Sequence, residues 1–261
     1  MTLVIALRWV EKGNDSILIS SDSKASGYVA YEVKKIYPIY YSKGKKDVYL
    51  GIAGGSGDPS QIKKGYEIIE EILKKHSENL ENQPLDFDEF RKAVREIERE
   101  LVNYSNFLKE SKIEPEFDIV LGSVDKNGKS SLYRFDWRGL AEPVHDSPGF
   151  AIIGKGSITG GMLLTKLLGY SPENSPKMDL GLLSAFIIDM VSEIDPSVGP
   201  FVGESYLMRL EKGIPVIGPL KSHALKQYKK KVRLRKLLIQ YLQEVCDRVG
   251  EEKVLKMLKS L

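Results

Sequence analysis

The 261-residue sequence has few of the residues that carry disulfide, metal or membrane chemistry. Its single cysteine, Cys246, excludes an internal disulfide and is typical of a reducing compartment. The three histidines, His76, His145 and His223, are scattered without ligand spacing, so we expect no metal and no cofactor. No apolar run is long enough to span a membrane, and the first residues lack the pattern of a signal peptide. We therefore expect a cytoplasmic protein with no membrane segment.

The charges of the sequence are unevenly divided. Residues 1–220 hold 27 basic and 32 acidic residues, a net charge of −5, whereas residues 221–261 hold 12 and four, a net charge of +8. Residues 221–236 alone contain eight Lys or Arg and no acidic residue. This division predicts a body at 1–220 and a basic C-terminal helical extension at 221–261.

The basic segment 221–236 has two interpretations. Most charge runs form a solvated helix face, and the alternative is a docking surface for an acidic protein partner. Nucleic acid is a less favoured partner, because the body is acidic and the extension has only Tyr228 and Tyr241 for stacking on bases.

The hydrophobic pattern predicts strands, two helices, strands, two helices and strands, followed by the extension. The expected strands are residues 2–8, 16–21, 33–39, 47–53, 117–124, 131–136, 150–154, 202–209 and 214–217. The expected helices are residues 61–76, 86–108, 157–168, 179–194 and 223–249. Gly250 is expected to end the last of these, and a short amphipathic helix is expected to run from there to Leu261. This order predicts an α+β protein, a four-layer αββα sandwich with two sheets face to face and a helix pair outside each.

Several short signals fix the ends of these elements. Asp86 and Asp179 stand where a helix N-cap is expected, and Asn127-Gly128 is a strong hairpin signal. The run Gly54-Gly55-Ser56-Gly57-Asp58 follows the strand at 47–53. So many glycines indicate a backbone that closely approaches another group or adopts a positive φ.

Thr2 is the first candidate for chemistry. Once Met1 is removed, Thr2 carries a hydroxyl nucleophile and a free α-amine, whose pKa of about 7.7–8.0 lets it act as the base. Thr2 alone does not distinguish this role from an ordinary strand that begins with threonine. Additional segments downstream are therefore needed to favour the catalytic interpretation.

These segments make residues 2–218 resemble the proteasome β-subunit family of N-terminal nucleophile (Ntn) hydrolases. The matches occur in the family's order and are spread along the body. They are Thr2-Leu3-Val4, Ser21-Asp22-Ser23-Lys24-Ala25-Ser26, Lys34-Lys35-Ile36-Tyr37-Pro38-Ile39, Gly51-Ile52-Ala53-Gly54-Gly55-Ser56-Gly57-Asp58, Ile153-Gly154-Lys155-Gly156-Ser157 and Asp195.

The resemblance implies a catalytic role for each matched residue. Thr2 Oγ would attack an amide carbonyl, Lys35 would lower the pKa of the Thr2 hydroxyl and amine, and Asp22 would hold Lys35. The Gly54 N–H would donate to the oxyanion, and Asp195 would orient the N-terminus.

The resemblance also implies a specificity pocket for an apolar side chain. The residues at its lining positions are small or aliphatic and carry no charge. They are Ala25, Ser26, Val33, Ile52 and Ser56.

The sequence departs from the family pattern near the expected amine. Lys155 replaces a serine, and two lysines beside the Thr2 amine would lower the pKa of that amine. The serine that normally contacts the amine is either lost or shifted to Ser197. The amine also requires the removal of Met1.

The sequence predicts a threonine-type peptidase or amidohydrolase that acts on peptide or protein substrates through an acyl-enzyme. A transpeptidase would use the same acyl-enzyme, and a catalytically silent scaffold that binds partners is the alternative from a different class. Because the family uses the helices at 61–76 and 86–108 between subunits, we expect a homo-oligomer.

Overall fold

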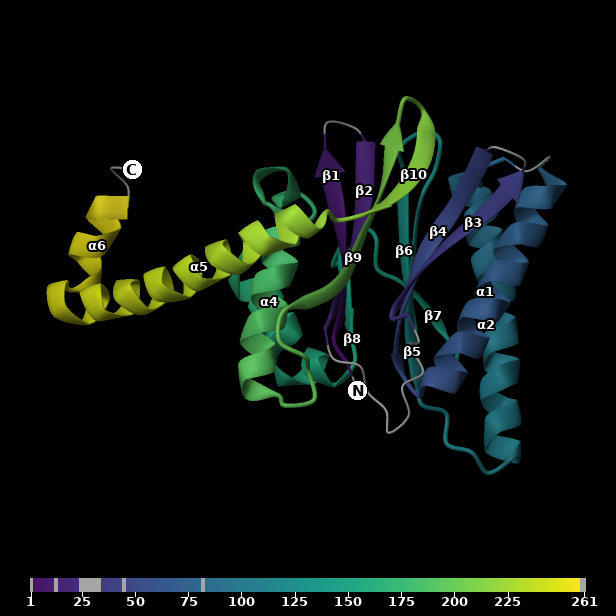
Figure 1. Ribbon diagram of the computed structural model, residues 1–261, viewed down its shortest axis with the longest axis horizontal. Helices are drawn as coiled ribbons and strands as arrows, with labels where there is room; N and C mark the ends of the chain where they lie inside the picture. Colours follow the sequence, from purple (N-terminus) through teal and green to yellow (C-terminus); the bar gives the residue numbers. More distant parts are fainter. Residues whose placement is uncertain (1, 12–13, 24–33, 44–45, 81–82, 259–261) are drawn as a thin grey trace. The chain divides into compact units, whose positions relative to one another are not determined.

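In the computed structural model, residues 2–11, 14–23, 34–43, 46–80 and 83–258 are described. The chain divides into two units, residues 1–220 and residues 221–261. The first unit combines two five-stranded antiparallel sheets with helices (Figure 1). The α+β class predicted from the sequence is therefore confirmed.

The first sheet, sheet A, begins with the hairpin of β1 and β2. Its strand order is β10-β9-β2-β1-β8, and all its neighbours are antiparallel. Its strands are β1 (Val4–Glu11), β2 (Asn14–Asp22), β8 (Phe150–Ile153), β9 (Val202–Glu211) and β10 (Ile214–Pro219). The N-terminal strand β1 is thus an inner strand, held between β2 and β8.

The second sheet, sheet B, has the order β3-β4-β5-β6-β7. Its strands are β3 (Ile36–Lys43), β4 (Lys46–Gly57), β5 (Phe117–Val124), β6 (Ser130–Phe135) and β7 (Ala141–Pro143). The short edge strand β7 was missed in the sequence, because its three residues are only partly buried or exposed and give no hydrophobic pattern.

The helices of the first unit lie on the outer faces of the two sheets, as Figure 1 shows. Helices α1 (Pro59–Asn79) and α2 (Phe87–Glu110) contact sheet B. Helix α4 (Leu180–Ile194) contacts sheet A. The short segments η1 (Ser157–Gly161) and α3 (Met162–Leu167) contact α4, and η2 (Ser175–Lys177) contacts β1. The inner faces of the sheets share an apolar core that includes Val4, Ile19, Ile52 and Val120.

Aspartate side chains begin the three long helices of this unit. Asp58 accepts hydrogen bonds from two backbone N–H groups at the start of α1, Asp86 accepts from Glu89 N and Asp179 accepts from Leu182 N. Such caps satisfy N–H groups that have no partner within the helix. The Asp86 and Asp179 caps are where the sequence predicted them.

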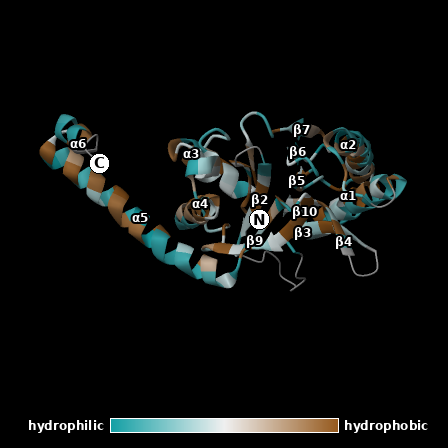
Figure 2. Cartoon of the chain, turned by 90° about the horizontal axis from the view of Figure 1, so that it is seen from above, coloured by the Kyte–Doolittle hydropathy of each residue, from teal (hydrophilic) through white to brown (hydrophobic). Residues whose placement is uncertain are grey.

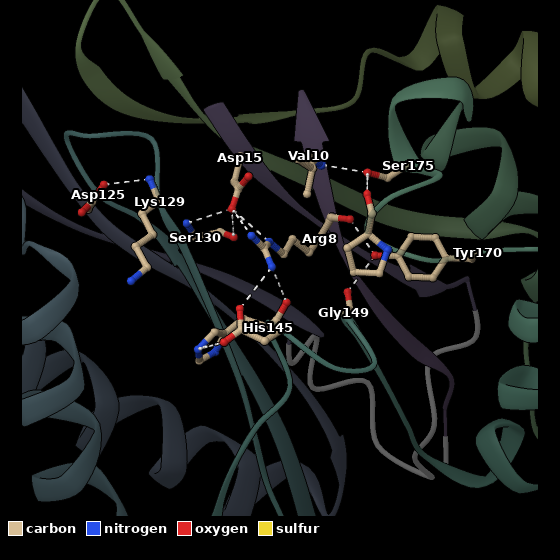
Figure 3. Close-up of polar contacts among 12 residues, drawn as sticks. Arg8, Val10, Asp15, Asp125, Lys129, Ser130, His145, Gly149, Tyr170 and Ser175 are labelled. Carbon is tan, nitrogen blue, oxygen red and sulfur yellow. Dashed lines mark hydrogen bonds and ion pairs between the residues drawn. The ribbon is translucent and has the colours of Figure 1, made fainter. Parts of the chain in front are cut away.

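A polar network joins the sheets near the β1–β2 turn (Figure 3). Arg8 on β1 forms an ion pair with Asp15 on β2, with Nη2 and Oδ2 2.8 Å apart, and donates to His145 O at 2.7 Å. The same Asp15 oxygen accepts from the Ser130 hydroxyl of sheet B at 2.7 Å. This network fixes the hairpin at the end of β1 that lies away from Thr2.

The second unit consists of helices α5 (Ser222–Val249) and α6 (Glu251–Leu258). Apolar residues alternate with hydrophilic ones along α5, as Figure 2 shows. Gly250, with φ at 85°, ends α5 where the sequence predicted an end. Within the described ranges, neither these helices nor those of the first unit are long and apolar enough to cross a membrane.

Candidate active site

Thr2 lies directly before β1, where two other segments reach it. The register pairs Val4 with Ser21 of β2 and with Ile153 of β8. One step further, the Asp22 N–H donates to Leu3 O at 3.1 Å. The antiparallel pairing therefore brings the end of β2 beside Thr2, which is itself buried with 4% of its surface exposed.

The Asp22 carboxylate is the centre of the site. Its Oδ1 accepts three hydrogen bonds, from the Thr2 hydroxyl, from Lys35 Nζ at 2.9 Å and from Leu3 N at 3.0 Å. Its Oδ2 accepts from Gly199 N at 2.6 Å. Thr2, Asp22 and Lys35, which the sequence places far apart, are thus brought together at one carboxylate.

The protonation of Asp22 follows from these contacts. Burial by itself raises the pKa of the carboxyl, but the hydrogen bonds from Lys35, Thr2 and Leu3 N lower it further than burial raises it. The pKa of Asp22 therefore lies below its ordinary value, and the carboxylate is charged at neutral pH. The charged Asp22 carboxylate accepts a charge-assisted hydrogen bond from Lys35 Nζ at 2.9 Å.

Lys35 is held in place through its backbone as well as its amine. Its carbonyl oxygen accepts from Gly55 N at 3.0 Å and from the Tyr66 hydroxyl of α1 at 2.8 Å. A Cβ on Gly55 would lie 2.7 Å from the Tyr66 hydroxyl and 2.5 Å from Ile62. Glycine at position 55 therefore permits α1 to reach the lysine, which explains one member of the glycine run.

Gly54 does not take the orientation that the oxyanion role requires. The Gly55 N–H bonds to Lys35 O on the β3 side, and the Asp58 N–H bonds to Glu116 O on the β5 side. Because N–H directions alternate along a strand, the Gly54 N–H faces β5, where Gly54 pairs with Val120. The predicted donation from Gly54 to a reacting carbonyl is not met by this register.

Asp195, the residue at the C-terminal end of α4, forms a separate polar cluster with Thr159 and Ser197. Its Oδ1 accepts from the Ser197 hydroxyl at 2.6 Å and its Oδ2 from Thr159 at 3.1 Å. The Ser197 contacts are the largest cause of a lowered Asp195 pKa, and the positive charge of Lys155 adds to them. The hydrogen bond of Ser197 thus goes to Asp195, which is a different arrangement from a contact with the Thr2 nitrogen.

The Lys155 side chain is exposed to solvent. Its charge acts on Asp195, and no described hydrogen bond joins it to Thr2. The β8–η1 loop contacts Thr2 through Gly154, and the position of Lys155 beside the Thr2 amine stays a prediction. A Cβ on Gly154 would lie 2.0 Å from Thr2 O.

The predicted specificity residues have different outcomes. Ala25, Ser26 and Val33 lie outside the described residues. Ile52 is fully buried in the core between the sheets, so its side chain packs there and does not face solvent. Ser56 is buried on β4, and its hydroxyl lies next to the Gly154 loop and Thr2.

Two residues of the site were not identified in the sequence. Gly199 donates to Asp22, and Tyr66 donates to the Lys35 carbonyl. Gly199 lies in the loop between α4 and β9, and Tyr66 lies on the buried face of α1. A signal for either would have required knowledge of which distant segments meet.

Comparison with protein families and with curated proteins found no match for this chain. Among the residues that the structure describes, no three His, Cys, Asp or Glu side chains are grouped so as to hold a metal ion.

Proposed function

We propose that the protein is a threonine-type peptidase or amidohydrolase with the αββα fold of the proteasome-like Ntn hydrolases. The observation that carries this proposal is the convergence of the Thr2 hydroxyl and Lys35 Nζ on Asp22 Oδ1. It supplies a nucleophile, a cation beside it and a carboxylate that orients both. The order of helices, sheet, sheet and helices in residues 1–220 supports the same class.

In the proposed reaction, Thr2 Oγ1 attacks the amide carbonyl of a peptide or protein. The positive charge of Lys35 lowers the pKa of the hydroxyl, and Asp22 holds Lys35 in position. The Thr2 amine, freed by removal of Met1, takes the hydroxyl proton and passes it to the leaving amine. Water, or a second amine in a transpeptidase, then releases the acyl group from Thr2.

A catalytically silent scaffold of the same fold is the second candidate. The observation that favours it is the direction of the Gly54 N–H, which is engaged towards β5 rather than facing a reacting carbonyl. An active enzyme would need another donor for the oxyanion or a change of this strand end on substrate binding.

The two candidates are separated by mass spectrometry of the intact protein. An enzyme loses Met1 and gains one adduct when treated with a β-lactone, an electrophile that acylates activated threonine hydroxyls. Thr2→Ala must abolish the adduct, whereas Lys34→Ala, which removes an exposed neighbouring lysine, must retain it. Retention of Met1 together with no adduct supports the scaffold.

A further inference from the structure

The second unit of the chain carries a row of apolar side chains along α5 that are exposed or partly exposed. They recur three, four, seven and eight positions apart, so they lie on one face of the helix. They are Leu234, Leu237, Leu238, Tyr241, Leu242, Val245 and Val249. Leu237 and Tyr241 are each 63% exposed. We call this face the α5 stripe, and its length is about 22 Å.

Within the second unit as it is described, little covers this face. Helix α6 contacts α5 and its Val254 is buried, yet the four leucines and Tyr241 of the stripe are between 42% and 63% exposed. Of the 28 residues of α5, all of them described, only Val232 is buried. A large exposed apolar patch usually marks an interaction site, and a helix is stabilised chiefly by packing its apolar face. The α5 stripe therefore needs an occupant.

Charge is divided along the same unit. Residues 221–236 hold eight basic residues and no acidic residue, whereas residues 244–252 hold four acidic residues and a single basic one. The basic residues Lys229, Lys230 and Lys231 are exposed, and so is Glu244 at the other end. The two ends of α5 are therefore complementary in charge, and a second copy of the chain offers both of them.

Charge decides the orientation in which two α5 helices can pair. In a parallel pair the two basic segments 221–236 would lie side by side, about 10 Å apart, and repel each other. In an antiparallel pair that crosses between Tyr241 and Leu242, the two Lys229 residues would be about 38 Å apart. That separation is several times the Debye length of about 8 Å, so the repulsion is screened. Each basic segment then extends towards the acidic end of the other helix, which favours the antiparallel pair.

The antiparallel orientation also matches the apolar side chains. With the same crossing point, Leu238 would lie against Val245 of the second copy, and Leu234 against Val249 of the second copy. The whole stripe would thus be covered by the same stripe of the other chain. Such an arrangement is a closed two-fold pair, in which each contact occurs twice.

We propose that α5 is a self-association surface, on which two copies of the chain pack their α5 stripes antiparallel and cross between Tyr241 and Leu242. An anionic membrane is a poorer occupant, because residues 237–249 hold two acidic residues and one basic residue. A membrane-bound helix instead carries Lys and Arg beside its apolar face. The surface is distinct from that of α1 and α2, and the proposal does not depend on the proposed catalytic function.

Sedimentation of the full chain over about 1–100 μM tests the surface, and we expect a monomer–dimer equilibrium. Tyr241→Glu places a charge twice in the paired stripes and should raise the dissociation constant at least about a hundredfold. Gln243→Glu is the matched control, because it adds the same charge at an exposed position about 200° around the helix and should change the constant less than about threefold. Circular dichroism verifies that both variants are folded. A wild-type protein that stays monomeric, or an association that survives Tyr241→Glu, overturns the proposal.

A distance between spin labels then tests the orientation. Cys246 is the single cysteine of the sequence, so a full-length Lys229→Cys, Cys246→Ser protein carries one nitroxide label per chain, at an exposed position. Double electron–electron resonance should give a distance of about 40 Å between the labels of two copies. A parallel pair would bring the labels to about 10 Å, and that result would overturn the antiparallel arrangement.

Discussion

Thr2 and Lys35 share a single acceptor atom, because the Thr2 hydroxyl and Lys35 Nζ both donate to Asp22 Oδ1. The positive charge next to the hydroxyl is therefore fixed by a third residue that is almost fully buried. A lysine tied to a buried carboxylate keeps its position when solvent enters the site. This geometry makes the three residues one unit, whose members are expected to fail together when any one is removed.

Removal of the lysine should greatly slow the labelling of Thr2 while the fold survives. Lys35→Ala takes away the charge that lowers the hydroxyl pKa, so we expect β-lactone labelling to slow by at least about a hundredfold. Lys34→Ala is the matched control, since Lys34 is the preceding, exposed lysine. Labelling rates come from intact-mass time courses, and circular dichroism verifies the fold. Similar rates for the two variants would contradict the assignment of Lys35.

The lowered pKa of Asp22 predicts a definite pH dependence of stability. The folded-state pKa lies below the ordinary value of 3.8, so the contribution of Asp22 is complete above that value and is lost as pH falls through the folded pKa. Asp22→Asn should cost about 3 kcal/mol at neutral pH, because it leaves Lys35 without its counter-charge. The difference between wild type and variant should shrink below about pH 4.

Urea unfolding at several pH values between 3 and 7 measures this difference. Asp179→Asn serves as the control, since Asp179 caps α4 and an asparagine cap is nearly equivalent. A wild-type advantage over Asp22→Asn that stays constant down to pH 3 would show that the carboxylate is not stabilised by its partners.

Gly55 should tolerate no side chain. In Gly55→Ala the new Cβ would lie 2.5 Å from Ile62 and 2.7 Å from the Tyr66 hydroxyl, so we expect a loss of about 1–3 kcal/mol in the free energy of unfolding. Gly218→Ala is the control, because no atom lies within 4 Å of a Cβ at that position. Tyr66→Phe should cost about 1 kcal/mol, since Lys35 O keeps its bond from Gly55. Equal unfolding midpoints for Gly55→Ala and Gly218→Ala would contradict the packing.

The Arg8–Asp15 pair should stabilise the folded protein without affecting the reactivity of Thr2. Asp15→Asn weakens the partly buried pair with Arg8 and its contact with Ser130, so a loss of about 2–3 kcal/mol is expected. Arg209→Ala breaks an exposed pair and should cost less than about 1 kcal/mol. Labelling of Thr2 should be unchanged in both variants at a temperature where both are folded. A slower reaction in Asp15→Asn would connect this network to the site.

The sequence was most informative where structure is locally encoded. The strand at 117–124, the caps Asp86 and Asp179 and the end of α5 at Gly250 depend on residues within one or two turns of each other. These features were predicted at or near their observed positions. Their physical causes, periodicity and capping, are present in the sequence itself.

The site was predicted in part, because its contacts join distant segments. Asp22 and Lys35 were identified through the resemblance, whereas Gly199 and Tyr66 contribute backbone or hydroxyl donors that leave no mark in the sequence. The direction of the Gly54 N–H depends on the parity of the strand register, and a shift by one residue would reverse it. Sequence patterns do not determine that parity.

The bond from Tyr66 to the Lys35 carbonyl has a mechanical consequence. Tyr66 belongs to α1, a long helix in the outer layer of the unit, while Lys35 bonds to the innermost charged group of the site. A hydrogen bond weakens steeply when its atoms separate by a few tenths of an ångström. A displacement of α1 would therefore lengthen this bond and weaken one of the two hydrogen bonds that hold the Lys35 carbonyl, the other being the bond from Gly55 N.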